Sequence, residues 1–209
     1  DDITPLIGMR VVEFVVLANP KYSNIQTLDD LIALGASGKN IKYATTGGPG
    51  NDSYTMISVL FKKLGLPAQA VPYDGGQDAI NALLGGHVDI AIGSPPVYRD
   101  YVKSGELSCL GTFIPDGIEV EGIGRIPSFS EQGIAAEFVG MDYFAVKSSV
   151  DESKQATLTK FIQDVYADPE FTSFMTSLGM EAWISTEDEI VGEINRQSVA
   201  MKEYIDLIK

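Results

Sequence analysis

Short apolar runs that alternate with amphipathic stretches are the feature that most restricts how this chain can fold. The runs are rich in Val, Ile, Leu and Ala and predict strands, while the stretches between them carry apolar residues at the spacing of one helix face. Strands that alternate with helices favour an α/β fold on an open parallel sheet. The predicted strands are 11–18, 41–44, 69–73, 88–93, 107–114 and 137–147, and the predicted helices are 27–36, 51–64, the stretch between Gly76 and Gly85, and 95–103.

The remaining segments break this alternation. Residues 115–125 are rich in glycine and acidic side chains and lack periodicity, which predicts a loop, and residues 127–133 predict a short helix that Gly133 ends. From Asp151 onward, three apolar stripes at helical spacing predict an almost entirely helical segment. We expect this segment to be loosened or self-associated, because the strands that should cover its apolar faces lie mostly outside these 209 residues.

Composition and charge argue against several classes of function. Fifteen Lys and Arg against 29 Asp and Glu give a net charge of −14, which argues against nucleic-acid binding, since phosphates need a basic surface. The single cysteine, Cys109, allows no internal disulfide, and the single histidine, His87, leaves little from which to build a hydrolytic centre. We therefore expect no enzyme activity, no cofactor and no metal. No apolar run approaches the roughly 18 residues of a membrane span, and the first residues lack the pattern of a signal peptide.

Three turns that follow predicted strands are the strongest sign of a binding site. They are TTGGPGNDS at 45–53, YDGGQD at 73–78 and GSPP at 93–96. In an open parallel sheet, ligands bind outside the carboxyl ends of the strands, so these turns are expected to share one rim. Bare glycine backbone and helix N-termini offer N–H donors to a carboxylate or phosphate, although a Walker lysine is missing. The alternative that the turns are ordinary short connections stays open.

The candidate ligand-binding residues lie in these turns, together with one tyrosine of the strand at 137–147. Backbone N–H groups and small hydroxyls are expected to hold the ligand. Asp52 is expected to cap a helix rather than touch an anion, because two bare carboxylates repel each other. The candidates are Thr45, Thr46, Gly47, Gly48, Gly50, Asn51, Asp52, Ser53, Tyr73, Gly75, Gly76, Ser94 and Tyr143.

Four segments resemble the substrate receptors of tripartite tricarboxylate transporters, also called Bug receptors. They are YATTGGPGNDSYTMISVLF at 43–61, VPYDGGQDAINALLGGHVDIAIGSPP at 71–96, YVKSGELSCLGTF at 101–113 and IPSFSEQG at 126–133. The resemblance implies a two-lobed α/β architecture of the periplasmic binding protein type II class and a periplasmic or otherwise extracytoplasmic location. It implies a receptor that closes around a small organic carboxylate, such as a di- or tricarboxylate, and delivers it to membrane permease subunits.

The resemblance also implies a division into lobes. Residues 1–18 would be a remnant of lobe one with the first hinge strand, 19–139 a complete ligand-binding lobe, and 140–209 the second hinge strand with the C-terminal helices of lobe one. The N-terminal part of lobe one is expected to be absent, and Tyr143 is expected near the cleft between the lobes. Gly93 stands where many members carry an acid, so the identity of the carboxylate stays open. An alternative with the same architecture is the effector-binding domain of a transcription regulator.

Overall fold

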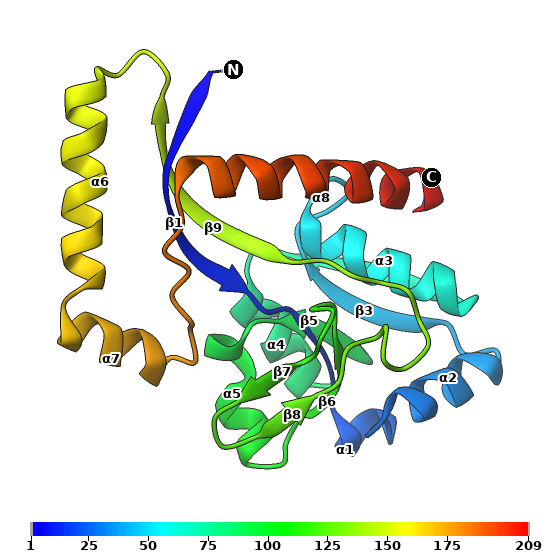
Figure 1. The fold of residues 1–209 in the computed structure, drawn as a ribbon. Coiled ribbons are helices and arrows are strands. Elements are labelled where there is room, and N and C mark those ends of the chain that lie inside the picture. The colour runs from blue at the N-terminus through cyan, green and yellow to red at the C-terminus, as the bar shows by residue number, and fades with distance from the viewer. Residues whose placement is uncertain (1, 209) are drawn as a thin grey trace. The chain divides into compact units, whose positions relative to one another are not determined.

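The computed structural model describes residues 2–208, which form an α/β protein (Figure 1). The chain divides into two compact units. Unit 1 comprises Asp1–Val12 and Val139–Met201, and unit 2 comprises Glu13–Phe138 and Lys202–Lys209. The lobe boundaries 1–18, 19–139 and 140–209 stay a prediction.

Unit 2 is built on a five-stranded mixed sheet. Its strands are β2 (Val15–Ala18), β3 (Ile41–Thr46), β4 (Ala68–Tyr73), β5 (Ile90–Gly93) and β6 (Ser108–Thr112), in the order β4-β3-β5-β2-β6. β3 runs parallel to both β4 and β5, whereas β2 runs antiparallel to β5 and β6. The expected parallel sheet is therefore right for the three strands that precede the predicted binding turns and wrong for β2.

Helices cover both faces of this sheet. Helices α2 (Leu28–Ala36) and α3 (Asp52–Leu64) pack on one face, and α4 (Gly76–Leu84) and α5 (Pro95–Lys103) pack on the other, while the short α1 (Pro20–Ser23) follows β2. Ile90 and Ile92 of β5 belong to the core cluster of the first face and Ala91 to that of the second. Both faces of β5 are buried, which explains its continuous apolar sequence. The strand predicted at 88–93 is confirmed.

Two predicted elements are corrected, one at the boundary of the two units and one inside unit 2. The single strand expected at 11–18 is two strands, because β1 ends at Val12 and β2 begins at Val15. The loop expected at 115–125 contains a hairpin, with β7 (Ile118–Val120) antiparallel to β8 (Gly124–Ile126). The missed sequence signal was the apolar–polar–apolar alternation along β7. Ile118 and Val120 are apolar and buried, and the acidic residue between them is exposed.

The short helix expected at 127–133 is also wrong, because this segment forms turns. Its backbone pairs with β6 instead. Thr112 N–H donates to Pro127 O at 3.0 Å, and Phe129 N–H donates to Thr112 O at 2.9 Å. A distant strand thus competes with the local helix signal and determines the conformation.

Unit 1 contains a two-stranded antiparallel sheet and three helices. β1 (Ile3–Val12) pairs with β9 (Gly140–Lys147), and the helices are α6 (Glu152–Tyr166), α7 (Pro169–Ser177) and α8 (Glu187–Ile208), whose residues from Lys202 onward belong to unit 2. The segment before α8 lies along the other edge of β1, where Gly8 N–H donates to Ser185 O at 3.2 Å. A side chain on Gly8 would not fit, since an added Cβ would lie 2.1 Å from Ser185 Oγ.

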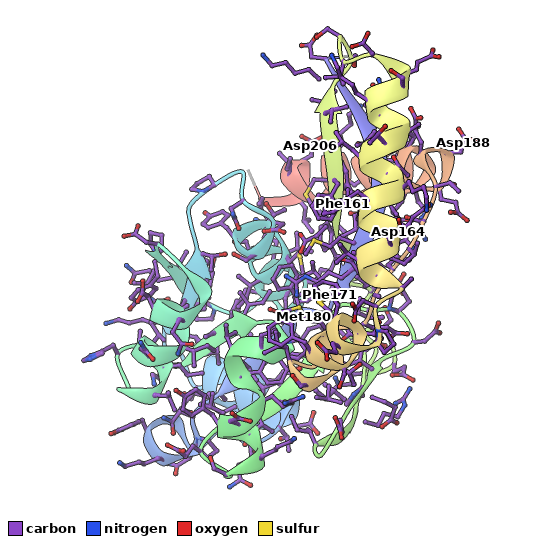
Figure 2. The ribbon with its side chains drawn as sticks, turned by 90° about the vertical axis from the view of Figure 1, so that its left-hand side faces the viewer. Phe161, Asp164, Phe171, Met180, Asp188 and Asp206 are labelled. Carbon is purple, nitrogen blue, oxygen red and sulfur yellow. The ribbon has the colours of Figure 1, made fainter. Side chains whose placement is uncertain are left out.

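The helical C-terminal segment is confirmed, but α6 buries little of its apolar stripe. None of its residues is fully buried, and Phe161 is 65% exposed. Figure 2 shows the side chains along α6 and α7, with Phe161 and Phe171 labelled. Helices gain most of their stability from packing of an apolar face, so α6 has weak support within the described residues.

We expect the backbone of α6 to open far more often than that of β5, because β5 is buried on both faces and α6 is not. Hydrogen exchange measured by mass spectrometry should show amides of α6 exchanging at least about a hundredfold faster than those of β5. Exchange in α6 as slow as in β5 would contradict this expectation.

Candidate functional site

The register of the parallel strands brings the three predicted turns to one edge of the sheet. Thr46, the last residue of β3, pairs with Tyr73, the last residue of β4. On the other side of β3, Ala44 pairs with Ala91, and the same register continued places Thr46 level with Gly93 at the end of β5. Neighbouring strands lie about 4.8 Å apart, so the three connections leave the sheet within about 10 Å of one another.

The connection from β3 to α3 is a tight glycine loop. Gly47 and Gly50 adopt φ values of +84° and +96°, a left-handed conformation that side chains disfavour. Asn51 is the N-cap of α3, and its side chain accepts a hydrogen bond from Ser53 N–H at 3.0 Å. Gly47 N–H donates to Tyr73 O at 2.9 Å, which ties the loop to the end of β4.

The buried Ser53 side chain holds this loop in shape. Its hydroxyl accepts from Thr46 N–H at 3.0 Å and lies 2.8 Å from both Thr46 Oγ1 and Asn51 Oδ1. Thr45 is also buried, and its hydroxyl donates to Gly47 O at 2.8 Å. Three of the small hydroxyls predicted for ligand contact, those of Thr45, Thr46 and Ser53, therefore make hydrogen bonds inside the loop. Asp52 Oδ1 accepts from Ser53 N–H at 2.7 Å, but the N-cap of α3 is Asn51 and Asp52 is the first residue of the helix, so the capping role expected of Asp52 falls to Asn51.

The other two turns differ in what they offer a ligand. Gly75 is the N-cap of α4 and has no side chain with which to cap it. Ser94 is the N-cap of α5, and its hydroxyl makes no capping hydrogen bond. Pro95 and Pro96 fill the first turn of α5 and carry no N–H groups. The α5 terminus thus offers its dipole and the Ser94 hydroxyl, but few backbone donors.

Unpaired backbone donors come from the first two turns. Within residues 2–208, the N–H groups of Gly48, Gly50, Gly76 and Gln77 find no hydrogen-bond acceptor. Side chains at Gly48 and Gly75 would meet no atom within 4 Å, so the space before them is open. Open backbone donors beside helix N-termini favour an anionic group such as a carboxylate.

None of the candidate residues is basic, and the groups that support the sheet below them are neutral. Burial raises the pKa of the Cys109 thiol in β6 to about 12. Burial also raises the pKa of the Tyr98 phenol in α5. Both groups stay protonated at neutral pH, so neither adds a negative charge below the three turns.

His87, the single histidine of the chain, lies beside a surface hollow of unit 2. His87 is exposed after α4 and, with Tyr73, Asp74 and Asn81, lines an open hollow of about 540 Å³. Sequence reasoning missed Thr55, whose buried hydroxyl donates to Asn51 O at 2.9 Å and so supports the cap of α3. Its position one turn after the cap was the available signal.

Tyr143 lies in β9 of unit 1, half-buried and paired with Gly8. The remaining candidates all belong to unit 2. The grouping of Tyr143 with the three turns stays a prediction.

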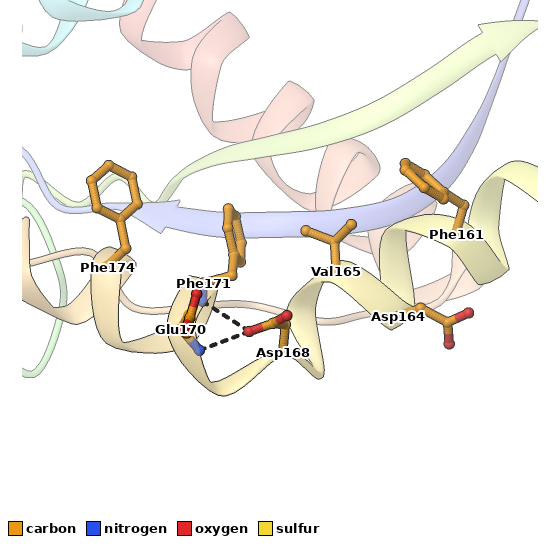
Figure 3. A pocket seen from close by; sticks show the side chains of 7 residues that line it. All are labelled: Phe161, Asp164, Val165, Asp168, Glu170, Phe171 and Phe174. Carbon is orange, nitrogen blue, oxygen red and sulfur yellow. Dashed lines mark hydrogen bonds between the residues drawn. The ribbon is translucent and has the colours of Figure 1, made fainter.

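Unit 1 has an open hollow of different chemistry between α6 and α7, of about 500 Å³ (Figure 3). The side chains of Phe161, Val165, Phe171 and Phe174 lie on one side of the two helices. Asp168 at the rim is engaged as the N-cap of α7, where it accepts from Glu170 N–H at 2.8 Å. Four apolar and three acidic side chains line this hollow, and acidic side chains would repel a carboxylate.

Comparison with known proteins identifies the family. The family described as "Tripartite tricarboxylate transporter family receptor" matches residues 1–209, and the chain belongs to this family. BugT of Bordetella pertussis is 24% identical over 209 residues, covering 97% of this chain. The chain spans 63% of the length of BugT. None of the described helices is both long and apolar enough to cross a bilayer.

Solved structures share the fold of the chain and confirm the predicted two-lobed α/β class. Rpa4515 of R. palustris with adipate gives a TM-score of 0.86 at 16% identity, covering 99% of this chain and 69% of that protein. MatC of Rhodopseudomonas palustris with bound malate gives a TM-score of 0.80 at 17% identity, and the match covers 99% of this chain and 70% of that protein. BugD, a periplasmic binding protein, gives a TM-score of 0.83 at 20% identity, and the match covers 98% of this chain and 68% of that protein.

The loop glycines should differ in what a methyl group does to stability. Gly50→Ala should lower the free energy of unfolding by about 1–2 kcal/mol, because a side chain resists the left-handed conformation. Gly48→Ala should change it by less than about 0.5 kcal/mol, because the φ of Gly48 lies outside the left-handed region and the added methyl meets open space. Urea unfolding of both variants measures the difference, and equal losses would contradict the loop geometry.

Proposed function

We propose that this protein is an extracytoplasmic solute receptor, periplasmic in location, that binds a small organic carboxylate without catalysis. The observation that carries the proposal is the single edge at which β3, β4 and β5 end. There, unpaired N–H groups and helix N-termini face open space without a basic side chain. The relatives solved with adipate and with malate support a dicarboxylate or related acid as the ligand.

In this proposal the candidate residues play two roles. The N–H groups of Gly48, Gly50 and Gly76 and the Ser94 hydroxyl bind one carboxylate group. Thr45, Thr46, Asn51 and Ser53 hold the glycine loop in shape through their hydrogen bonds. Lobe closure then brings further donors to the ligand, Tyr143 among them. A hydrogen bond to a charged group contributes roughly 1.5–3 kcal/mol, so two or three per lobe are enough for roughly micromolar binding.

The proposed partner is the membrane permease of a tripartite tricarboxylate-type transporter, to which the receptor delivers its ligand. The family description favours this transport role over the effector domain of a transcription regulator. The net charge of −14 argues against nucleic acid as a partner.

A valine at Gly48 should weaken carboxylate binding at least about tenfold, because its side chain occupies the space through which a carboxylate reaches the backbone. Isothermal titration with adipate and malate measures the affinity of the wild-type chain and of Gly48→Val. Gly192→Val is the matched control, since Gly192 is equally open and lies in α8 of unit 1, outside the three turns.

Unchanged affinity in a folded Gly48→Val variant would remove the glycine loop from the site. If mono-, di- and tricarboxylates all fail to bind the wild-type chain, the proposed ligand class is wrong.

A further inference from the structure

The hollow of about 540 Å³ beside His87 has a polar lining that plays no part in the carboxylate site proposed above. Besides His87, its polar side chains are Tyr73 at the end of β4, Asp74 in the turn that follows, and Asp78 and Asn81 in α4. Asp78 and Asn81 are one helical turn apart and so lie on the same face of α4. All of these residues belong to unit 2, so the hollow forms within one compact unit.

The two carboxylates of this lining are unengaged. Within the described part of the chain, the side chains of Asp74 and Asp78 make no hydrogen bond and no ion pair. Two of the acidic residues at the hollow between α6 and α7 are engaged instead, since Asp164 pairs with Lys160 at 2.9 Å and Asp168 caps α7. Two unengaged carboxylates at one hollow favour a positively charged group that donates hydrogen bonds to them.

The same two carboxylates flank backbone donors that are proposed to bind a carboxylate. Asp74 precedes Gly76 by two residues and Asp78 follows it by two, at the N-terminus of α4. A ligand carboxylate at the Gly76 N–H group therefore lies close to two negative charges, which repel it. A ligand that carries a positive group beside its carboxylate offsets this repulsion.

An ammonium group suits this lining better than a metal ion does. Among the residues that the structure describes, no three His, Cys, Asp or Glu side chains are grouped as metal ligands are. An ammonium has three N–H donors, for which two carboxylates provide enough acceptors. A tyrosine ring such as that of Tyr73 also attracts a cation that lies over its face.

We propose that the preferred ligand of this receptor is an amino acid, and that Asp74 and Asp78 are the residues that select it. This inference rests on the proposed function, because it takes the open N–H groups as the carboxylate site. The turn at 73–78 then has two roles. The N–H groups of Gly76 and Gln77 bind the carboxylate, and the side chains of Asp74 and Asp78 bind the ammonium group on the neighbouring carbon.

L-Malate and free L-aspartate test the proposal, because they share one carbon skeleton and differ only in a hydroxyl or an ammonium group. Isothermal titration should give the wild-type chain an affinity for free aspartate at least about tenfold higher than for malate. The double variant Asp74→Asn, Asp78→Asn removes both charges and keeps the size of the side chains. Its affinity for free aspartate should fall at least about tenfold, while its affinity for malate should rise.

The double variant Asp29→Asn, Asp100→Asn is the matched control. Asp29 lies in the first turn of α2 and Asp100 lies in α5, and both are exposed and outside the hollow. This variant changes the net charge of the chain by the same amount. It should leave both affinities within about twofold of the wild type.

Opposite changes for the two ligands would support the proposal, because a damaged fold would weaken the binding of both. Equal wild-type affinities for the two acids, or losses of equal size in the Asp74 and Asp78 variant, would overturn it. Binding of malate without binding of free aspartate would also overturn it and would leave the proposed function intact. If the wild-type chain binds neither free aspartate nor any mono-, di- or tricarboxylate, the proposed function fails, and this inference fails with it.

Discussion

The register of β3 between β4 and β5 is the constraint on which the candidate site depends. Side chains on a strand alternate between faces, so a slip of one residue would turn the buried Tyr43 and Ala44 toward the wrong layers. The packing of α3 and α4 on opposite faces therefore fixes the register. Because the register is fixed, Thr46, Tyr73 and Gly93 end at one level, and the bond from Gly47 N–H to Tyr73 O continues the pairing into the loop.

The loop is held by neutral hydrogen bonds rather than by charges. Ser53 is buried and joins the end of β3 to the cap of α3. Without its hydroxyl, Thr46 N–H would lose its acceptor, and an unsatisfied buried donor costs about 1–3 kcal/mol. At physiological salt, the electrostatic repulsion between surface carboxylates and an anionic ligand is screened beyond roughly 8 Å. The acidic surface therefore weakens only slightly the binding of an anion by N–H donors that contact it directly. A chain with a net charge of −14 can thus still offer a local anion site.

Elements with local signals could be predicted from the sequence, and those with distant partners could not. Thr27 and Asp30 form the reciprocal capping box that begins α2, and Asn51 caps α3, each within a few residues. The turns at 127–133 depend on backbone bonds to Thr112, which no local pattern reveals. In the site, the glycine loop could be predicted from its composition. The inward direction of the Ser53 hydroxyl could not, because it depends on how α3 packs against β3.

The two units differ in how much apolar surface supports them, and this difference bears on the site. Both large buried clusters lie within unit 2, whereas unit 1 leaves Phe161 65% and Phe174 57% exposed. At about 25 cal/mol per Å² of buried apolar surface, a few hundred Å² amounts to several kcal/mol, comparable to the stability of a small domain. The three turns belong to the unit with the larger core. Their geometry therefore follows from the packing of unit 2 alone and persists even where the helices of unit 1 open.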